Sequence, residues 1–329
     1  MSPIRAVVTG GAGFIGSHLV ERLISRGDEV TVFDAGPIPD DQSLARTHAR
    51  HVRGDVRDPD RLTAAISGAD VVYHLAAVVG VDQYLSRPLD VVTVNFQGTW
   101  NVLDQAARTG ARVVVASTSE VFGKNPAVPW PEGADRVLGP TSADRWAYSS
   151  AKALAEHLTL AFHRQHGLRA TIVRYFNAYG PRQRPAFALS RSVHRALNGR
   201  PVVLYDDGKQ TRCFTFVDDV VTGTLLAASH PAAVGESFNL GSSDESAVMD
   251  AVGLVASLTG ARTTVVDTVA TLGSGYEDVP RRIPDSSKAR ALLGWRCETS
   301  LKDGLAKTIE WAQANPWWLA LPDSGAPAN

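Results

Sequence analysis

The amino-acid sequence predicts an α/β fold built around a parallel sheet. Short apolar runs alternate with helical patterns through the first half of the 329 residues, and strands that alternate with helices form a parallel sheet with helices on both faces. A glycine-rich turn, Gly10 to Gly16, joins the first apolar run to the first helical pattern. Beyond residue 177 the periodic pieces become shorter. We therefore predict a Rossmann-type doubly wound parallel sheet with a smaller mixed α/β substrate-binding domain.

The predicted strands of the first half are apolar runs rich in valine, as expected for strands buried on both faces. They cover residues 4–9, 29–34, 71–74, 112–116 and 169–174. The helices between them have apolar residues spaced three or four apart. They run from residue 14 to about 26, from residue 59 onward, from 88 to 108 and from 146 to 166. This alternation is the pattern of one sheet wound on both faces.

The second half has a different texture, richer in Pro, Gly and Arg. Its shorter periodic pieces cover residues 187–198, 220–228, 247–258 and 287–293. We predict a first domain over residues 1–176 and a second over 177–314, which binds substrate and is partly interleaved with the first. Residues 315–329 lack a periodic pattern, so we expect a flexible tail there.

The charge balance favours a small-molecule partner. The chain has 33 basic and 34 acidic residues, so no strong field draws it to nucleic acid or to an anionic membrane. Its two cysteines, Cys213 and Cys297, lie far apart without metal-ligand spacing, and we expect no metal site. No segment reaches the ~18 continuous apolar residues of a membrane span, and Met1 leads directly into the first strand. We expect a soluble, unprocessed protein in the cytoplasm.

The turn after the first strand predicts a dinucleotide site. Gly11, Gly13 and Gly16 stand between a predicted strand and a predicted helix, where glycines let backbone amides approach a pyrophosphate at the helix N-terminus. Asp34 ends the second strand about 20 residues further on, where its carboxylate can accept hydrogen bonds from a ribose 2′-hydroxyl and would repel a 2′-phosphate. The sequence therefore predicts NAD rather than NADP. Asp55 can contact the adenine or be a solvated loop residue.

A second pattern predicts proton transfer. Tyr148 and Lys152 lie four residues apart on a predicted helix and share one face of it. A tyrosine needs a nearby cation to act as a base near neutral pH, and Lys152 and an oxidised nicotinamide can supply that charge. Thr118 and Ser119 follow the fourth predicted strand, at the edge where parallel strands form a ligand crevice. Their hydroxyls can share the proton of the reacting oxygen.

With these residues in place, the chain over residues 4–312 resembles the extended short-chain dehydrogenases/reductases, in the group of nucleotide-sugar epimerases, dehydratases and decarboxylases. The motifs that carry the resemblance are Thr9–Gly16, His74–Ala77, Asn95, the serine-rich segment, Tyr148 with Lys152, Arg174–Pro181 and Gly208–Arg212. It implies oxidation of a sugar hydroxyl by NAD. It also implies a homodimer formed by the helices near residues 88–108 and 146–166.

The motifs and the resemblance together assign the site residues. The predicted cofactor-binding residues are Gly10, Gly13, Phe14, Ile15, Gly16, Asp34, Asp55, Val56, Leu75, Ala76, Ala77, Asn95, Tyr148 and Lys152. The predicted substrate-binding residues are Tyr84, Asn177, Arg184, Arg212 and Arg282. Asn177 and Arg212 are expected to hold the diphosphate, which suits amide and guanidinium donors. Uridine is the base that the resemblance implies.

Glu120 favours one reaction within the group. The segment Thr118-Ser119-Glu120 resembles that of UDP-glucuronate decarboxylases, and Arg282 matches a catalytic arginine of the decarboxylase domain in the lipid A aminoarabinose pathway. Once C4 of a glucuronate is a ketone, the carboxylate on C5 belongs to a β-keto acid and can leave as carbon dioxide. The expected catalytic residues are therefore Thr118, Ser119, Glu120, Tyr148, Lys152 and Arg282. The expected product is UDP-4-keto-xylose, UDP-xylose or both.

Other reactions stay open. The segment from Gly180 to Pro185 resembles the loop of UDP-glucuronate 4-epimerases, in which an arginine matching Arg184 binds the sugar carboxylate. A nucleotide-hexose 4,6-dehydratase is a third possibility, although Asp34 disfavours the NADP of some of these enzymes. The fold can also serve as a non-catalytic NAD-binding scaffold, against which the intact Tyr148 and Lys152 argue.

Overall fold

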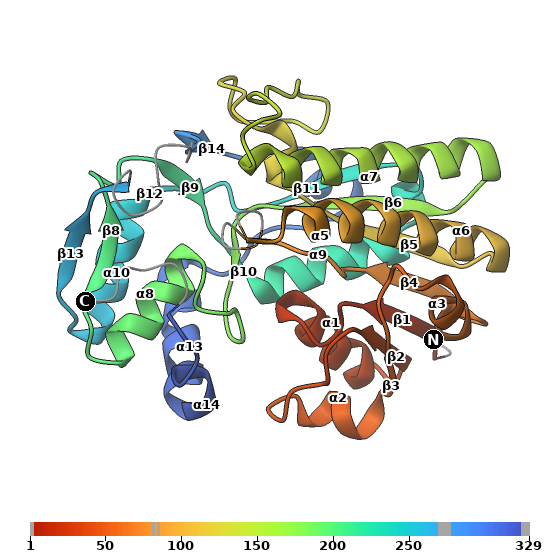
Figure 1. Ribbon diagram of the computed structural model, residues 1–329, viewed down its shortest axis with the longest axis horizontal. Helices are drawn as coiled ribbons and strands as arrows, with labels where there is room; N and C mark the ends of the chain where they lie inside the picture. The colour runs from red at the N-terminus through yellow and green to blue at the C-terminus, as the bar shows by residue number, and fades with distance from the viewer. Residues whose placement is uncertain (1–2, 81–82, 84–85, 269–277, 324–329) are drawn as a thin grey trace.

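The computed structural model describes residues 3–80, 83, 86–268 and 278–323 (Figure 1). Its core is a seven-stranded sheet in the order β11-β6-β5-β4-β1-β2-β3, and all neighbouring strands are parallel. The strands are β1 Arg5–Thr9, β2 Glu29–Asp34, β3 Arg50–Arg53, β4 Val71–His74, β5 Arg112–Thr118, β6 Ala170–Tyr175 and β11 Ser237–Leu240. The predicted doubly wound sheet is confirmed.

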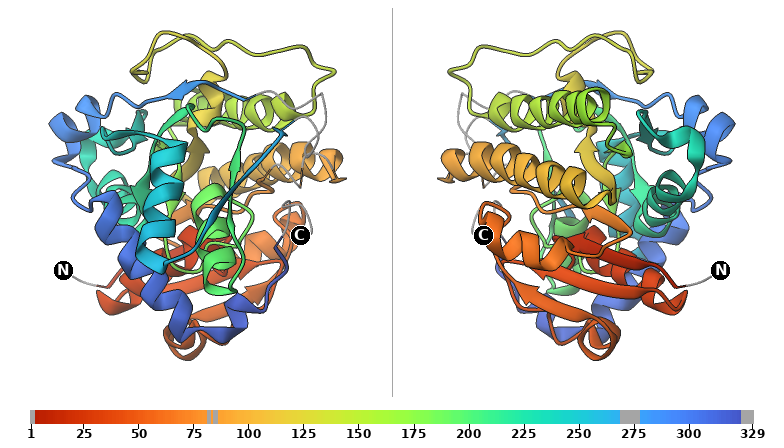
Figure 2. Two further views of the ribbon diagram at one scale, coloured as in Figure 1. Left: turned by 90° about the vertical axis from the view of Figure 1, so that its left-hand side faces the viewer. Right: turned by 90° about the vertical axis from the view of Figure 1, so that its right-hand side faces the viewer.

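Helices cover both faces of the sheet, as Figures 1 and 2 show. One face carries α3 Pro59–Ile66, α6 Thr99–Thr109 and α7 Arg145–His166, and the other carries α1 Phe14–Ser25, α9 Val217–Ser229 and α12 Ser287–Leu293. The central strands are buried on both sides, because their valines meet apolar helix faces above and below. None of the helices in the described ranges is long and apolar enough to cross a membrane.

Two strands of the sheet were not predicted. The edge strand β3 consists of Arg50, His51, Val52 and Arg53, and its polar side chains hide it from a search for apolar runs. At the other edge, β11 is only four residues long and lies more than 60 residues after its neighbour β6 in the sequence. The second half of the chain therefore returns to the first sheet, because β11 and α9 both pack there.

The long helix predicted over residues 88–108 has a wide turn in its middle. It consists of α5 Pro88–Thr93, a π-helical turn Val94–Gly98 and α6. The π-helical turn holds Asn95, which is fully buried and donates to the carbonyls of Val78 (3.0 Å) and Val91 (2.7 Å). Such turns are frequent near functional sites, and this one fixes the loop that follows β4.

The remainder of the second half is mixed α/β, as predicted. Its helices are α8 Ala188–Leu197, α10 Val248–Thr259 and α13 Leu301–Ala314. Its strands are β7 Ala178–Tyr179, β8 Val202–Tyr205, β9 Thr211–Cys213, β10 Thr215–Phe216, β12 Glu245–Ala247, β13 Thr263–Val266 and β14 Arg281–Arg282. They form small sheets of two or three strands beside the main sheet.

The segment after Ala314 differs from the predicted flexible tail. Its first part forms the short helix α14 Pro316–Leu319, and Trp318 is fully buried. Asp323 makes a buried ion pair with Arg195 of α8 at 2.6 Å. Trp318 and this ion pair dock the segment on the rest of the protein. A four-residue helix is too short to show a period, so the sequence pattern gives no sign of this docking.

A buried ion pair joins three elements beneath the end of β5. Arg174 of β6 donates from Nε and Nη2 to the two carboxylate oxygens of Glu156 on α7, at 2.8 and 2.6 Å. Each of these side chains is 10% exposed. Glu156 also accepts a hydrogen bond from Ser117 at the end of β5. The guanidinium of Arg174 stacks over the ring of Phe122.

We expect the substitution Arg174→Met to lower the free energy of unfolding by about 3–5 kcal/mol, because Glu156 would keep a buried charge without its partner. Urea denaturation followed by circular dichroism measures this loss. Arg5→Met is the matched control, since the ion pair of Arg5 with Asp70 is about half exposed and exposed ion pairs contribute little to stability. Equal losses in the two variants would contradict the assigned importance of the buried pair.

Candidate active site

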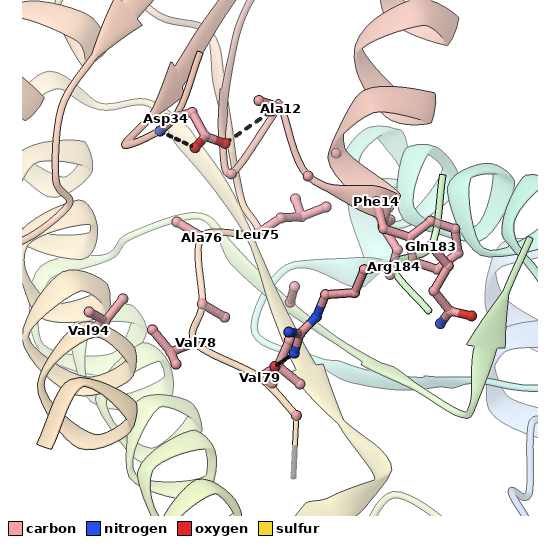
Figure 3. Close-up of a pocket in the computed structure, with 18 of the residues that line it drawn as sticks. Ala12, Phe14, Asp34, Leu75, Ala76, Val78, Val79, Val94, Gln183 and Arg184 are labelled. Atoms are coloured by element: carbon pink, nitrogen blue, oxygen red, sulfur yellow. Dashed lines mark hydrogen bonds between the residues drawn. The ribbon is translucent and has the colours of Figure 1, made fainter. Parts of the chain in front are cut away.

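A cavity of about 930 Å³ opens at the carboxyl ends of the central strands. Most of the predicted site residues line it. They are Gly10, Gly13, Phe14, Ile15, Gly16, Asp34, Asp55, Val56, Leu75, Ala76, Ala77, Thr118, Ser119, Glu120, Tyr148, Lys152, Asn177, Arg184 and Arg282. Figure 3 shows part of this wall, with the glycine turn and Asp34 facing the loop after β4. The topology thus gathers predicted residues from both halves of the chain around one space.

Among the residues that the structure describes, two predicted site residues are not part of that wall. Asn95 lies beneath the loop after β4, so it positions Val78 rather than facing the cavity. Arg212 is buried in β9, where it donates to the carbonyl of Val279 and pairs with Asp278, both at 2.7 Å. Tyr84 lies outside the described residues.

The glycine turn fits a dinucleotide by its lack of side chains. A Cβ atom on Gly16 would lie 2.1 Å from the carbonyl oxygen of Gly10, and one on Gly10 would lie 2.7 Å from the amide of Ala76. Gly10 has a φ of 71°, which disfavours a side chain further. Gly13 caps the N-terminus of α1, whose dipole and free amides favour an anion. The described residues therefore form the cradle that a pyrophosphate requires.

Asp34 is fixed beside this turn. Its carboxylate accepts hydrogen bonds from the backbone amides of Ala12 and Gly36, both at 3.0 Å (Figure 3). Its place at the end of β2 suits a ribose hydroxyl and disfavours a phosphate. Asp55 also lines the cavity, but Arg57 binds its carboxylate, and these hydrogen bonds lower the pKa of Asp55. Any cofactor contact at Asp55 must therefore share that carboxylate with Arg57.

Helix α7 presents Tyr148 and Lys152 on one face toward the end of β5. Thr118 is hydrogen-bonded to the phenol of Tyr148. Burial raises the pKa of Tyr148, and the negative charge of Glu120 raises it further. Burial lowers the pKa of Lys152 to about 8, although the carboxylate of Glu156 acts in the opposite direction. Burial thus keeps the phenol of Tyr148 protonated and brings the pKa of the Lys152 ammonium down towards neutral pH.

Glu120 and Arg282 meet in the cavity although they lie 162 positions apart in the sequence. Nη1 of Arg282 lies 2.8 Å from Glu120, and Nη2 of Arg145 lies 3.8 Å from the other oxygen. Burial opposes the charge of Glu120, but Arg282, Arg145 and Arg212 outweigh it and hold the pKa of Glu120 below its usual range. Glu120 is therefore a carboxylate among guanidinium groups. Such a charged wall suits a reaction in which negative charge develops.

The sequence did not assign a role to Arg145, although the residue lines the cavity. Its position three residues before Tyr148 places it on the same helix face, and that spacing is the signal that could have identified it. Trp317, Trp318 and Leu321 also line the cavity. They were missed because they lie in the segment predicted as a tail.

Asn177 and Arg184 contribute from the segment after β6. Asn177 has a φ of 40°, a backbone conformation that asparagine adopts more readily than most residues. Its side-chain amide donates to the carbonyl of Cys213 at 3.3 Å. Arg184 reaches across the cavity to donate to the carbonyl of Val79 at 2.7 Å (Figure 3). Both side chains remain at the wall of the cavity.

Comparisons with known proteins agree with this geometry. A UDP-N-acetyl-alpha-D-glucosaminuronate decarboxylase of Bacillus cytotoxicus is 38% identical over 93% of this chain and 97% of that protein. UDP-glucuronic acid decarboxylase 1 of Arabidopsis thaliana is 36% identical over 93% of this chain and 69% of its own length. The solved structure of MoeE5 in complex with UDP-glucuronic acid and NAD superimposes with a TM-score of 0.84 at 34% identity. That match covers 94% of this chain and 99% of the other.

The family model of the NAD dependent epimerase/dehydratase family matches residues 6–241. This match spans the glycine turn, the end of β5, Tyr148 with Lys152, and the return of the chain to the sheet at β11. The predicted NAD dependence agrees with that of the family. The chain belongs to the NAD dependent epimerase/dehydratase family.

Proposed function

We propose that this chain is a cytoplasmic, NAD-dependent decarboxylase of a UDP-linked uronate, with UDP-glucuronate as its substrate. The observation that carries the proposal is the ion pair of Glu120 with Arg282, in the same cavity as Tyr148 and Lys152. It is supported by two relatives that are named as decarboxylases of UDP-uronates and differ in the substituent of the sugar.

The first step is oxidation at C4 of the sugar. Bound NAD supplies the acceptor for the hydride of C4 and later its donor. Tyr148, as its phenolate, takes the proton of the C4 hydroxyl and becomes a phenol, and the hydrogen bond from Thr118 stabilises the phenolate before this transfer. Since burial keeps the phenol protonated in the protein alone, the base becomes effective only when positive charge surrounds it. Lys152 supplies part of that charge from the next turn of α7.

The second step is the loss of carbon dioxide. The ketone at C4 accepts the electron pair of the breaking C5–carboxylate bond as an enolate, so no further oxidant is needed. The guanidinium of Arg282 can stabilise the developing negative charge, and Glu120 holds this guanidinium in place. A proton must then be added to C5 in place of the carboxylate. An arginine is a weak acid, so Arg282 would act by holding a water molecule or the enolate.

A 4-epimerase is the second candidate. Arg184 favours it, because its guanidinium lines the same cavity and could bind a carboxylate that must survive the reaction. Both enzymes share the oxidation at C4, and they differ in what happens to C5. The 4,6-dehydratase and the non-catalytic scaffold are further outcomes of the test below.

The first test of the proposed function is incubation of the purified protein with UDP-glucuronate and NAD. We expect release of carbon dioxide and a pentose or 4-keto-pentose product by mass spectrometry. Glu120→Gln should lower kcat by about 100-fold or more, as expected for loss of a charged catalytic partner. Glu310→Gln on the exposed face of α13 is the control and should behave as the wild type.

The other outcomes of this experiment each have a meaning. An unchanged mass with a galacturonate product would establish the epimerase instead. Decarboxylation of UDP-N-acetylglucosaminuronate alone would move the substrate to the 2-acetamido sugar. No reaction with either uronate, but water loss from a nucleotide hexose, would identify a dehydratase.

The pKa of Lys152 predicts how activity depends on pH. Its ammonium is lost as the pH rises through about 8, and the cation that Tyr148 requires disappears with it. We therefore expect kcat/KM to fall on the alkaline side of about pH 8. Lys152→Arg should move this alkaline limb to higher pH, because a guanidinium stays protonated, even if the maximal rate is lower. An unmoved limb would show that another group titrates there.

We also propose a homodimer. Large apolar side chains are exposed on α5, α6 and α7, namely Leu89 (79% exposed), Val92, Trp100 and Leu154. These helices pack side by side on one face of the sheet. The double substitution Leu89→Glu/Leu154→Glu should convert a dimer into a monomer in light scattering coupled to gel filtration. Val265→Glu, at an exposed apolar residue of β13, should leave the mass unchanged, and a monomeric wild type would refute the proposal.

A further inference from the structure

Four consecutive residues after β7 connect separate walls of the cavity. These residues, 181–184, are called the clasp. The carbonyl of Pro181 contacts Nε2 of His18 on α1 at 3.0 Å. Each of the next three residues contacts a different segment of the cavity rim.

Arg182 makes the strongest of these contacts. Its Nη1 and Nη2 donate to the two oxygens of Glu21 on α1 at 3.0 and 2.9 Å, and its Nε donates to Asp41 at 3.1 Å. The side chains of Arg182 and Asp41 are 12% and 7% exposed. Paired guanidinium and carboxylate groups with this geometry are strong and directional. Arg182 therefore fixes the clasp to α1 and to the segment after β2.

The backbone of Arg182 is held in an uncommon conformation. Its φ of 68° lies in the left-handed region that few residues other than glycine occupy. Backbone strain of this kind persists where surrounding contacts enforce it, and it occurs often at ligand clamps. The contacts to Glu21 and Asp41 are those that enforce it here.

The other end of the clasp is fixed on both sides of the cavity. The carbonyl of Gln183 accepts a hydrogen bond from the buried indole of Trp318 on α14 at 2.9 Å. Arg184 donates to the carbonyl of Val79 in the loop after β4 at 2.7 Å (Figure 3). The clasp thus joins α1, the segment after β2, the loop after β4 and the C-terminal helix.

The partners of the clasp flank the predicted cofactor residues. His18 and Glu21 follow the glycine turn on the same helix, Asp41 follows Asp34, and Val79 follows Ala77 by two positions. Arg182, Gln183 and Arg184 line the same cavity as these cofactor residues. Separation of the cavity walls would therefore break the buried ion pairs of Arg182. The clasp restrains the three segments between which NAD is expected to bind.

We propose that the clasp retains NAD throughout the catalytic cycle, so that the hydride taken from C4 is returned to the same sugar. The consequence for the product rests on the proposed function. A retained cofactor ends the cycle as it began, and the main product is then the reduced UDP-pentose. Escape of the cofactor before the hydride returns would leave one 4-keto product for each reduced cofactor.

The test is the exchange of NAD in the absence of any sugar. Wild type, Arg182→Gln and Arg182→Lys are loaded with NAD and diluted, and the rate of release is followed together with the dissociation constant by calorimetry. We expect Arg182→Gln to bind NAD on the order of 10- to 100-fold more weakly, mainly through faster release. Arg182→Lys should lie between the two, because it keeps the charge but loses the paired geometry. Arg108→Gln, at an exposed ion pair on α6, is the control.

Two further measurements keep the test decisive. If Arg182→Gln does not fold, Glu21→Gln removes the same contact from its more exposed side and should also accelerate release. Wild-type release rates in folded variants would overturn the proposal. Failure of the decarboxylase assay would leave the exchange result intact, because no sugar is present. With UDP-glucuronate, an active Arg182→Gln should release more 4-keto product than the wild type.

Discussion

The buried ion pair of Arg174 and Glu156 is the interaction on which the active site depends. It connects β6 to α7, and through the hydrogen bond of Ser117 with Glu156 it also connects the end of β5 to both. The catalytic segment Thr118 to Glu120 begins at the next residue, and Lys152 lies one turn before Glu156 on α7. Burial of two charges is costly unless the geometry and the hydrogen bonds are good. The buried carboxylate of Glu156 also serves the chemistry, because its negative charge favours the protonated form of Lys152 against the effect of burial.

The oxidation at C4 does not decide which reaction follows, whereas the charges around Glu120 favour decarboxylation. With bound NAD as the hydride acceptor, the proposed roles of Tyr148, Lys152 and Thr118 in the oxidation at C4 do not depend on the substituent of C5. Glu120 stays ionised because burial is outweighed by Arg282, Arg145 and Arg212. A sugar carboxylate beside Glu120 would be repelled by it, and loss of carbon dioxide removes that repulsion. An epimerase, which must keep the carboxylate bound, gains nothing from such a neighbour.

The sequence predicted the parts of the fold that have a regular pattern. Strands β1, β2, β4, β5 and β6 are apolar runs, and α7 has a long helical period. The polar edge strand β3 and the distant strand β11 lack such a signal, because their pairing is decided by tertiary structure. The glycine turn, Asp34 and the pair Tyr148/Lys152 are local motifs and could be predicted. The contact of Glu120 with Arg282 is not local: the family resemblance indicated each residue as catalytic, but not the ion pair between them. Arg182 was missed because its partners, Glu21 and Asp41, lie far away in the sequence.

The long-range contacts share one property that relates the fold to its chemistry. Glu120 belongs to the first part of the chain and Arg282 to the second. Arg182 likewise joins the second part to α1 and Asp41 of the first. The contact between the two parts around the cavity therefore forms both the proposed decarboxylating pair and the clasp. A protein that must keep its cofactor between two hydride transfers gains from this coupling. Separation of the two parts, which would release the cofactor, would also separate Glu120 from Arg282 and so prevent decarboxylation. The same argument explains why the segment at residues 315–323 is docked, since the indole of Trp318 donates to the carbonyl of Gln183 and so supports the clasp.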